Sequence, residues 1–399
     1  MSNADPKNLE RLIEFTRAHE NEDPAALLLK GTPEGIDSRA AAEQIRSRQK
    51  ARSKLPHWYA AQDIVFPPPL SMEQASSQVA AAYKVRLLEA DPPADHEVLV
   101  DLTGGAGVDA LAFSQAFPRV IYVERDAGLC RVFAHNASRL TARPPEVVND
   151  DAAAYLRGFR GQATFYLDPD RRDPARRRVF RFEDSSPDVV ALLPLLRQRA
   201  QRVLVKASPM IDLSEAVRLL GDVREIHVVS ISGDCREVLF LLDIAKPTQP
   251  TIRCVELDEA GTVYAFDFDP QAERTAQCTM GALERYLYDP GPAIRKAGAF
   301  RTVAERFGLN KLAPNTHLYT ADRLVQNFPG RVFDVDPQTG KALRRAMGGS
   351  AANVMVRNHP LSAEELKHRY RLRDGGERWL IGFRDAAGRA KVVAAHRVA

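Results

Sequence analysis

The spacing of hydrophobic residues predicts that the first part of the chain is helical. Residues 1–95 contain "NLERLIEFTRAHE" and "SRAAAEQIRSRQKARSKL", which have helical apolar spacing and few β-branched residues. The run "FPPPLS" (66–71) interrupts the pattern. Ser71 is then placed to cap a helix "MEQASSQVAAAYKVRLLEA", and Gln74 completes a capping-box spacing. We expect one continuous helix there, ended by "DPPADH" (91–96).

From residue 97 onward, short apolar runs alternate with helical stretches. The strand-like runs are "EVLVDL" (97–102), "RVIYVER" (119–125), "EVVND" (146–150), "ATFYLDP" (163–169), "RVLVKAS" (202–208) and "EIHVVSI" (225–231). Helices are expected at 107–117, 127–140, 151–158, 186–200 and 212–220. This alternation predicts an α/β fold with a parallel sheet covered on both faces.

The segment "SGDCRE" (232–237) departs from this alternation. It joins "EIHVVSI" to "VLFLLDI" in too few residues for a crossover helix, so we expect a hairpin and an antiparallel last strand. The region beyond residue 250 is expected to be separate. It opens with a possible hairpin, "TIRCVEL" and "TVYAFDF", and continues with the strand-like runs "RVFDVD", "RWLIGFR" and "AKVVAAH".

Composition excludes several protein classes. The 399 residues are 45% hydrophobic and 27% charged, which is typical of globular proteins. No apolar run approaches the roughly 18 residues of a membrane span, and the polar N-terminus lacks a signal-peptide layout. The four cysteines are far apart without CxxC, so we expect free thiols in the cytoplasm and no metal site.

Basic residues are unevenly distributed although the net charge is only +4. The runs "RSRQKARSK" (46–54) and "RRDPARRRVFR" (171–181) suit a phosphate backbone. A solvated arginine-rich face is the alternative for each run.

The stretch "DLTGGAGVD" (101–109) follows the first predicted strand, where ligands bind in open parallel sheets. Gly104 and Gly105 allow a tight turn and close approach to a ligand, and Gly107 opens the next helix. No GK[ST] follows, so a nucleoside triphosphate is disfavoured. A variant GxGxxG dinucleotide loop stays possible from the glycines alone.

Asp101 decides between these ligands. A carboxylate there would repel a pyrophosphate, whereas it suits the amino group of the cationic ligand S-adenosylmethionine. Glu124 ends the second strand and is placed to accept both ribose hydroxyls of either ligand. In "NDDA" (149–152), Asp150 or Asp151 is placed to accept the adenine amino group, although each acid also suits a helix N-cap. The predicted cofactor set is completed by Thr103, Asp109, Arg125, Gln74 and Ser77.

The stretch "YLDPDRRD" (166–173) ends the fourth strand. Asp168 and Pro169 match the motif of methyltransferases that modify base amino groups, whereas Asp170 and Arg171 do not. Asp168 would hold the amino group, and Arg171 would stack on a base or hold a phosphate. The alternative is a structural network of Asp and Arg side chains.

Further residues are candidates for substrate contacts on the same rim. Lys206, after the fifth strand, has pairing with Asp168 as its alternative role. The helix of residues 70–84, before the first strand, has plain packing as its alternative role. The predicted substrate-binding residues are Arg172, Lys206, Ser208, Tyr83 and Lys84.

Several long stretches together resemble a bacterial family of class I S-adenosylmethionine-dependent methyltransferases with a THUMP-like C-terminal domain. They include "EQASSQVAAAYK", "DLTGGAGVD", "YLDPDRRD", "FEDSSPDV", "VLVKASPMIDL", "SGDCREVLFLL", "YLYDPGPAIRKAGAF", "KLAPNTHLYTAD" and "NVMVRNHPLSAEELKHRYRLRDGGERWLIGF". The resemblance covers most of residues 55–385. It implies S-adenosylmethionine as the cofactor and RNA as the partner, the latter by analogy with THUMP domains.

The resemblance also implies a domain organisation. A seven-stranded Rossmann-like sheet with an antiparallel last strand would form the methyltransferase domain. The expected domains are an N-terminal helical domain (1–95), the methyltransferase domain (96–248), a linking hairpin with a small ferredoxin-like segment (249–320) and the THUMP-like domain (321–399).

Four hypotheses follow. The first is a cytoplasmic methyltransferase acting on RNA, and the second is one acting on a protein or small molecule. The third is a non-catalytic RNA-binding factor with a vestigial fold. A dinucleotide-dependent oxidoreductase is a distant fourth, because the antiparallel last strand disfavours it.

Overall fold

The computed structural model describes residues 6–92, 97–171, 182–244, 249–336 and 338–398. The chain divides into two compact units. Unit 1 comprises residues 1–224 and 239–249, and unit 2 comprises residues 225–238 and 250–399. No helix in these ranges is long and apolar enough to cross a membrane. All four cysteines are free thiols, as expected.

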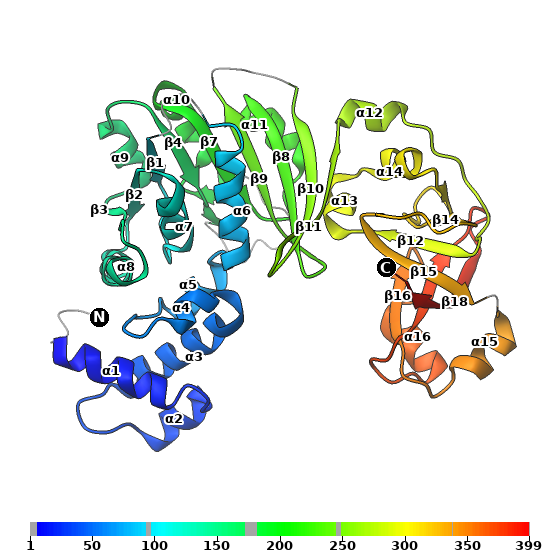
Figure 1. Ribbon diagram of the computed structural model, residues 1–399, viewed down its shortest axis with the longest axis horizontal. Helices are drawn as coiled ribbons and strands as arrows, with labels where there is room; N and C mark the ends of the chain where they lie inside the picture. The colour runs from blue at the N-terminus through cyan, green and yellow to red at the C-terminus, as the bar shows by residue number, and fades with distance from the viewer. Residues whose placement is uncertain (1–5, 93–96, 172–181, 245–248, 337, 399) are drawn as a thin grey trace. The chain divides into compact units, whose positions relative to one another are not determined.

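The first part of unit 1 is helical, as its apolar spacing predicted. Figure 1 shows α1 to α4, drawn in blue, gathered into one group. The helices are α1 (Pro6–Ala18), α2 (Pro24–Lys30), α3 (Ser38–Lys54), α4 (Pro56–Ala60), α5 (Pro69–Gln74) and α6 (Gln78–Glu89). Leu12, Leu27 and Ile45 bring α1, α2 and α3 together around one small apolar core.

The prediction of a single helix beginning after Ser71 is wrong, because the chain forms two helices there. Ala75 is extended, with φ −53° and ψ 151°, and ends α5. Ser77 caps α6 by accepting a hydrogen bond from the Ala80 backbone N–H at 3.2 Å. Gln74 is the last residue of α5 and forms no capping box. The break places the Ser76 hydroxyl 2.7 Å from Asp109, a tertiary contact that no local pattern encodes.

The large sheet has the strand order β11-β10-β8-β9-β7-β4-β1-β2-β3. Its strands are β1 (Val98–Asp101), β2 (Arg119–Glu124), β3 (Glu146–Asn149), β4 (Ala163–Leu167), β7 (Ala200–Ala207), β8 (Val223–Ile231), β9 (Asp234–Asp243), β10 (Thr251–Asp258) and β11 (Gly261–Phe268). The pairs β1–β2, β2–β3, β1–β4 and β4–β7 are parallel. Every residue of β4 is buried, as expected for a strand covered on both faces.

The predicted count of seven strands is corrected to nine. The hairpin "TIRCVEL"–"TVYAFDF" extends this sheet, because β10 pairs parallel with β8 and antiparallel with β11. β9 lies between β7 and β8, and only residues 232–233 link β8 to β9. An antiparallel direction for β9 stays the prediction made from this short link.

Five helices alternate with the strands of unit 1, close to their predicted ranges. They are α7 (Val108–Ala116), α8 (Ala127–Leu140), α9 (Ala152–Gly158), α10 (Val189–Arg199) and α11 (Leu213–Leu220). Aspartates cap four of them, namely Asp126, Asp151, Asp188 and Asp212. Such caps satisfy free N–H groups at the helix start, so an Asp beyond a strand has a structural role of its own. A short turn η1 (Phe182–Asp184) precedes α10.

Unit 2 contains a second sheet of order β13-β14-β12-β15-β18-β17-β16. Its strands are β12 (Tyr286–Pro290), β13 (Asn310–Lys311), β14 (Tyr319–Ala321), β15 (Gly330–Asp336), β16 (Asn353–Arg357), β17 (Arg378–Arg384) and β18 (Ala390–Arg397). The helices are α12 (Pro270–Thr275), α13 (Pro292–Ala297), α14 (Phe300–Phe307), α15 (Gly340–Met347) and α16 (Ala363–Tyr370). Leu343, Leu366 and Leu380 pack α15 and α16 onto β17.

A buried polar network joins α6, α7, the link between α5 and α6, and β4 in unit 1. The Asp109 carboxylate accepts hydrogen bonds from Ser76 Oγ at 2.7 Å, Tyr166 OH at 2.9 Å and Lys84 Nζ at 3.2 Å. Burial alone would raise the pKa of Asp109, but the Lys84 charge and these hydrogen bonds lower it overall. The network therefore stabilises the fold at neutral pH, and this contribution is lost as the pH falls through the lowered pKa.

Replacing Lys84 with methionine is expected to destabilise the protein by about 3–5 kcal/mol, because it leaves the Asp109 carboxylate buried without a cation. Urea unfolding followed by circular dichroism measures this. Lys50→Met is the matched control, since Lys50 forms a solvent-exposed pair with Glu73 and its removal is expected to change little. Equal midpoints for the two variants would contradict the structural role of Lys84.

Candidate active site

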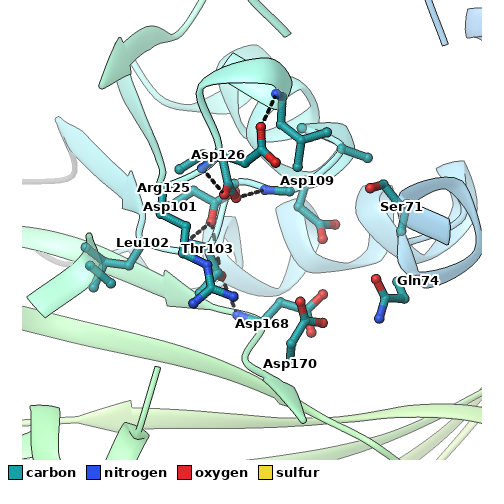
Figure 2. Close-up of a pocket in the computed structure, with 18 of the residues that line it drawn as sticks. Ser71, Gln74, Asp101, Leu102, Thr103, Asp109, Arg125, Asp126, Asp168 and Asp170 are labelled. Carbon is teal, nitrogen blue, oxygen red and sulfur yellow. Dashed lines mark hydrogen bonds between the residues drawn. The ribbon is translucent and has the colours of Figure 1, made fainter. Parts of the chain in front are cut away.

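A cavity of about 240 Å³ lies at the carboxyl ends of the parallel strands in unit 1. Its wall consists of Ser71 and Gln74–Ser76, Asp101–Asp109, Glu124–Asp126 and Leu129, Asp150–Ala152, Asp168, Asp170, Ser186 and Pro187. This is the edge at which the sequence predicted a ligand. Figure 2 shows Ser71 and Gln74 facing Asp168 and Asp170 across the space.

Glycine is required at the three positions of the loop for different structural reasons. A Cβ at Gly104 would lie 2.2 Å from the Tyr122 ring, and one at Gly107 would lie 2.0 Å from the Phe133 ring. These rings stack on each other at 4.0 Å, so the loop rests on an aromatic pair. Gly107 is also the N-cap of α7, as expected, with φ 82°. Only Gly105, with φ 53° and open space beside it, fits the expected close approach to a ligand.

Asp101 is buried at the end of β1. Its Oδ1 accepts a hydrogen bond from the Thr103 backbone N–H at 3.0 Å. No group in the described part of the chain donates to Oδ2. Burial raises the pKa of Asp101 well above its ordinary range, and the charges of Asp109, Asp168 and Glu124 raise it further. An ammonium group from a ligand would stabilise the ionised form.

Glu124 links the loops that follow the first two strands. Its Oε2 accepts from the Gly105 backbone N–H and its Oε1 from the Asp126 backbone N–H, both at 2.8 Å. Each oxygen keeps a further acceptor site, so the carboxylate is held in position while it faces the cavity. Arg125, beside it on the wall, donates to Ser186 Oγ at 3.2 Å.

Asp150 and Asp151 follow β3 and both line the cavity. Asp151 is the N-cap of α9, and its Oδ1 accepts from the N–H groups of Ala153 and Ala154 at 2.9 and 3.2 Å. The capping alternative raised from the sequence therefore applies to Asp151. The Oδ1 of Asp150 accepts from the Asp151 backbone N–H at 2.8 Å.

The end of β4 presents a carboxylate held by a lysine. Lys206 Nζ donates to Asp168 Oδ2, and the Asp168 backbone N–H donates to Thr103 Oγ1 at 2.6 Å. Asp170 belongs to the short strand β5 (Asp170–Arg171), which pairs with β6 (Ser185–Ser186). Burial raises the pKa of Asp170, and the Asp168 charge raises it further. Two neighbouring acids thus have different environments, because Lys206 donates to Asp168 and acts on Asp170 through its charge, which opposes the rise in the pKa of Asp170.

Several predicted residues do not lie on the cavity wall. Lys84 and Tyr83 are buried, and Lys84 binds Asp109, so a substrate contact for Lys84 is corrected to a structural role. Ser77 caps α6, and the Ser208 hydroxyl accepts from the Met210 backbone N–H at 3.3 Å. Pro169 is buried.

Two predicted residues have little structural description. Arg171 is placed only by its backbone in β5. Arg172 and the rest of the basic run up to residue 181 lie outside the described residues.

The sequence reasoning missed several wall residues. Ser76 was read as part of a continuous helix, and Asp126 has the signature of an N-cap only two residues after Glu124. Ser186 and Pro187 lie in "FEDSSPDV", a stretch that was noted without a role. They reach the cavity because β6 pairs with β5, a long-range contact without a local signal.

The charge of the wall decides which ligand fits. Eight acids line it, namely Asp101, Asp109, Glu124, Asp126, Asp150, Asp151, Asp168 and Asp170, and Arg125 is the one basic residue among the described lining. Such a wall repels a pyrophosphate and attracts a cation. Asp101, with an unused oxygen, and Glu124, with two aligned oxygens, suit an ammonium and a pair of ribose hydroxyls. The residues therefore fit S-adenosylmethionine.

Comparison with known proteins shows which families this chain resembles. Family models match residues 286–329 as a ferredoxin-like domain and residues 330–397 as THUMP domain-like. An uncharacterized S-adenosylmethionine-dependent methyltransferase of Mycobacterium tuberculosis, found in two strains, is 27% identical over 332 residues, which cover 82% of this chain and 86% of the relative.

A crystal structure of a putative methyltransferase from Porphyromonas gingivalis W83 is similar over both units. It has 32% sequence identity and a TM-score of 0.85, and the match covers 99% of this chain and 100% of that one. The expectation of a vestigial, non-catalytic fold and that of an oxidoreductase are thereby set aside. The chain belongs to the same family as this protein, that of S-adenosylmethionine-dependent methyltransferases with a THUMP-like C-terminal domain, and it is such an enzyme.

Proposed function

We propose that the enzyme transfers the methyl group to RNA. The observation that carries this proposal is the match of residues 330–397 to a THUMP domain-like model in a chain that also has a methyltransferase site. The analogy with THUMP domains supports RNA as the substrate class. The expected cytoplasmic location agrees with the four free thiols and stays a prediction.

Each cavity element has a proposed role toward the cofactor. Asp101 would accept hydrogen bonds from its ammonium group, and Glu124 from its ribose hydroxyls. Asp150 would accept from the adenine amino group, since Asp151 already caps α9. Thr103, Gly104, Gly105 and Gly107 shape the loop, while Gln74 and Arg125 lie on the wall. Asp109 acts indirectly, by fixing the start of α7.

Bound S-adenosylmethionine would supply an electrophilic methyl group on a sulfonium. The chain would then mainly position the nucleophile and exclude water. Because Lys206 holds Asp168 as an ion pair, its carboxylate can accept a hydrogen bond from an N–H or O–H nucleophile. Asp170 lies on the same cavity wall, and because its pKa is raised its carboxyl group is suited to exchange a proton with the substrate. Arg171 and Arg172 remain proposed substrate contacts.

One observation favours a protein or small-molecule acceptor as the second candidate. In the basic run 46–54, Arg48 pairs with Glu20 at 2.6 Å, and Lys54 donates to backbone carbonyls of Met72 and Glu73. Arg52 donates to Tyr59 at 3.1 Å. Arg48 and Lys54 are thus held by contacts within unit 1, which weakens the support that this run gives to RNA binding, although Arg52 stays 60% exposed.

Asp101→Asn is expected to weaken S-adenosylhomocysteine binding roughly tenfold to a hundredfold, since it removes a charged hydrogen-bond acceptor. In the unmodified enzyme, affinity should rise with pH as Asp101 loses its proton, because its pKa is raised. The variant should lose this dependence. Calorimetric titration across a pH series measures both effects. Glu259→Gln, at an exposed turn, is the control, and an unchanged pH profile in Asp101→Asn would refute the role.

Asp168→Asn is expected to slow methyl transfer roughly 100-fold or more while cofactor affinity stays near that of the unmodified enzyme. The physical reason is that the amide cannot accept the nucleophile's hydrogen bond as a carboxylate does. Single-turnover transfer and cofactor titration on the same preparation separate the two quantities. A near-normal transfer rate would remove Asp168 from the mechanism.

RNA as the substrate is tested with radiolabelled S-adenosylmethionine and a cell extract fractionated into RNA, protein and small molecules. We expect label in the RNA fraction, sensitive to ribonuclease, and weaker RNA binding as salt rises. The Asp168→Asn enzyme serves as the control for contaminating activity. Label confined to protein or small molecules would establish the second candidate instead.

A further inference from the structure

Three arginines in unit 2 surround one buried carboxylate. Asp289, at the end of β12, is only 1% exposed. Its oxygens lie 2.6 Å from Arg331 Nη2, 2.9 Å from Arg357 Nε and 3.3 Å from Arg295 Nη1. We call Asp289 and these three arginines the arginine cluster. Its three positive charges face one negative charge, so the carboxylate neutralises only part of the group.

The cluster gathers distant segments that the proposed catalytic site does not use. Asp289 and Arg295 belong to "YLYDPGPAIRKAGAF", and Arg357 belongs to "NVMVRNHPLSAEELKHRYRLRDGGERWLIGF". Arg331 is opposite Asp289 in the β12–β15 register. A third stretch of the resemblance, "KLAPNTHLYTAD", contains Lys311 and His317, and the charges of Arg295 and Arg357 act on the pKa of His317. Three of the stretches that carry the family resemblance therefore meet at one place.

His317 gives the cluster an unused polar group. Its Nδ1 is buried and has no hydrogen-bond partner among the residues that the structure describes, and its ring stacks on Phe300 with centroids 3.6 Å apart. Burial lowers the pKa of His317 to about 4, and the charges of Lys311, Arg295 and Arg357 contribute to this shift. His317 is thus neutral at physiological pH, and two of the charges that lower its pKa belong to Arg295 and Arg357 of the cluster.

Positive charge remains in excess when the neighbouring acid is counted. Glu256, on β10, is near enough for Arg295 to lower its pKa, although burial raises it overall. Arg295, Arg331 and Arg357 then face Asp289 and Glu256, while Lys311 has Glu273 as a nearby acid that opposes the lowering of its pKa by burial.

The arginines are also accessible and keep unused donors. Their side chains are 27%, 32% and 23% exposed for Arg295, Arg331 and Arg357, so solvent reaches the cluster. In the described part of the chain, Arg331 Nη1 and Arg295 Nη2 have no acceptor, so donors are free for a further anion.

We propose that the arginine cluster, with His317, is a binding site for a phosphate group. Asp289 holds the guanidinium groups in a fixed arrangement, and their unused N–H groups match phosphate oxygens, which accept forked hydrogen bonds from arginine. The assignment of this phosphate to RNA rests on the proposed function, whereas phosphate binding itself does not. The source is either an internal phosphodiester or a terminal phosphate of the RNA.

The first test uses inorganic phosphate, with chloride at equal ionic strength as the reference. Phosphate should raise the unfolding temperature of the full-length protein saturably. Arg357→Gln should weaken phosphate binding about tenfold or more, because it removes one of the three positive charges that attract the anion and leaves Arg295 and Arg331, which carry the unused donors, on Asp289. Arg345→Gln, exposed on α15, is the matched control and should bind normally. Equal binding by both variants, or no saturable effect in the unmodified protein, would overturn the site.

A second measurement does not depend on the folding of a variant. In the unmodified protein with labelled histidine, phosphate should shift the His317 imidazole signals with the same saturation curve. Unmoved His317 signals at saturating phosphate would overturn its place in the site.

The source of the phosphate is tested with one RNA sequence prepared with and without a 5′-phosphate. A preference for the phosphorylated form, lost in Arg357→Gln, supports a terminal phosphate. Equal binding that weakens about tenfold in Arg357→Gln supports a phosphodiester. RNA binding that is unaffected by Arg357→Gln overturns the assignment to RNA. If phosphate binds but RNA is not methylated, the proposed function fails alone; if RNA is methylated without phosphate binding, only this inference fails.

Discussion

The buried ion pair between Asp109 and Lys84 is the interaction on which the active site depends. Asp109 is the second residue of α7 and directly follows the glycine loop. Its partners come from α6, from the break between α5 and α6, and from β4. An unpaired carboxylate at this depth would be costly, so these partners must assemble together. The pair therefore fixes the loop, the helix α7 beside the cavity and the strand β4, which ends one residue before Asp168.

The carboxylates around the cavity differ in whether a cationic side chain pairs with them. Asp109 is paired with a lysine and Asp168 with another, whereas Asp101 is buried without a cation. In the proposed cofactor site, this unequal pairing would favour the cationic group of the ligand at Asp101, because a cation there would offset both the burial of Asp101 and its repulsion from neighbouring acids. The shape of the glycine loop is determined by its packing against aromatic side chains. Tyr122 and Phe133 pack against Gly104 and Gly107, so a stacked aromatic pair supports the conformation of the loop.

The two units have opposite local charge. Unit 1 surrounds its cavity with acids, whereas unit 2 surrounds Asp289 with arginines. An acidic cavity suits a cationic cofactor and a neutral nucleophile but repels phosphates. A nucleic-acid substrate would therefore need its phosphates to be bound elsewhere on the protein, and the arginine cluster has the chemistry for that task.

Local patterns in the sequence determined most elements and the position of the site. Alternating apolar runs predicted the strands and helices of residues 97–231 closely, and the acids at strand ends predicted the cavity wall, because these features depend on neighbouring residues and on the common edge of a parallel sheet. The tertiary structure decided the helix break at Ala75, the extension of the sheet by β10 and β11, and the burial of Lys84. It also brought together Asp289, Arg331 and Arg357. These features depend on charge pairing and hydrogen bonding between residues far apart in the chain, and no periodicity in the sequence records which partners meet.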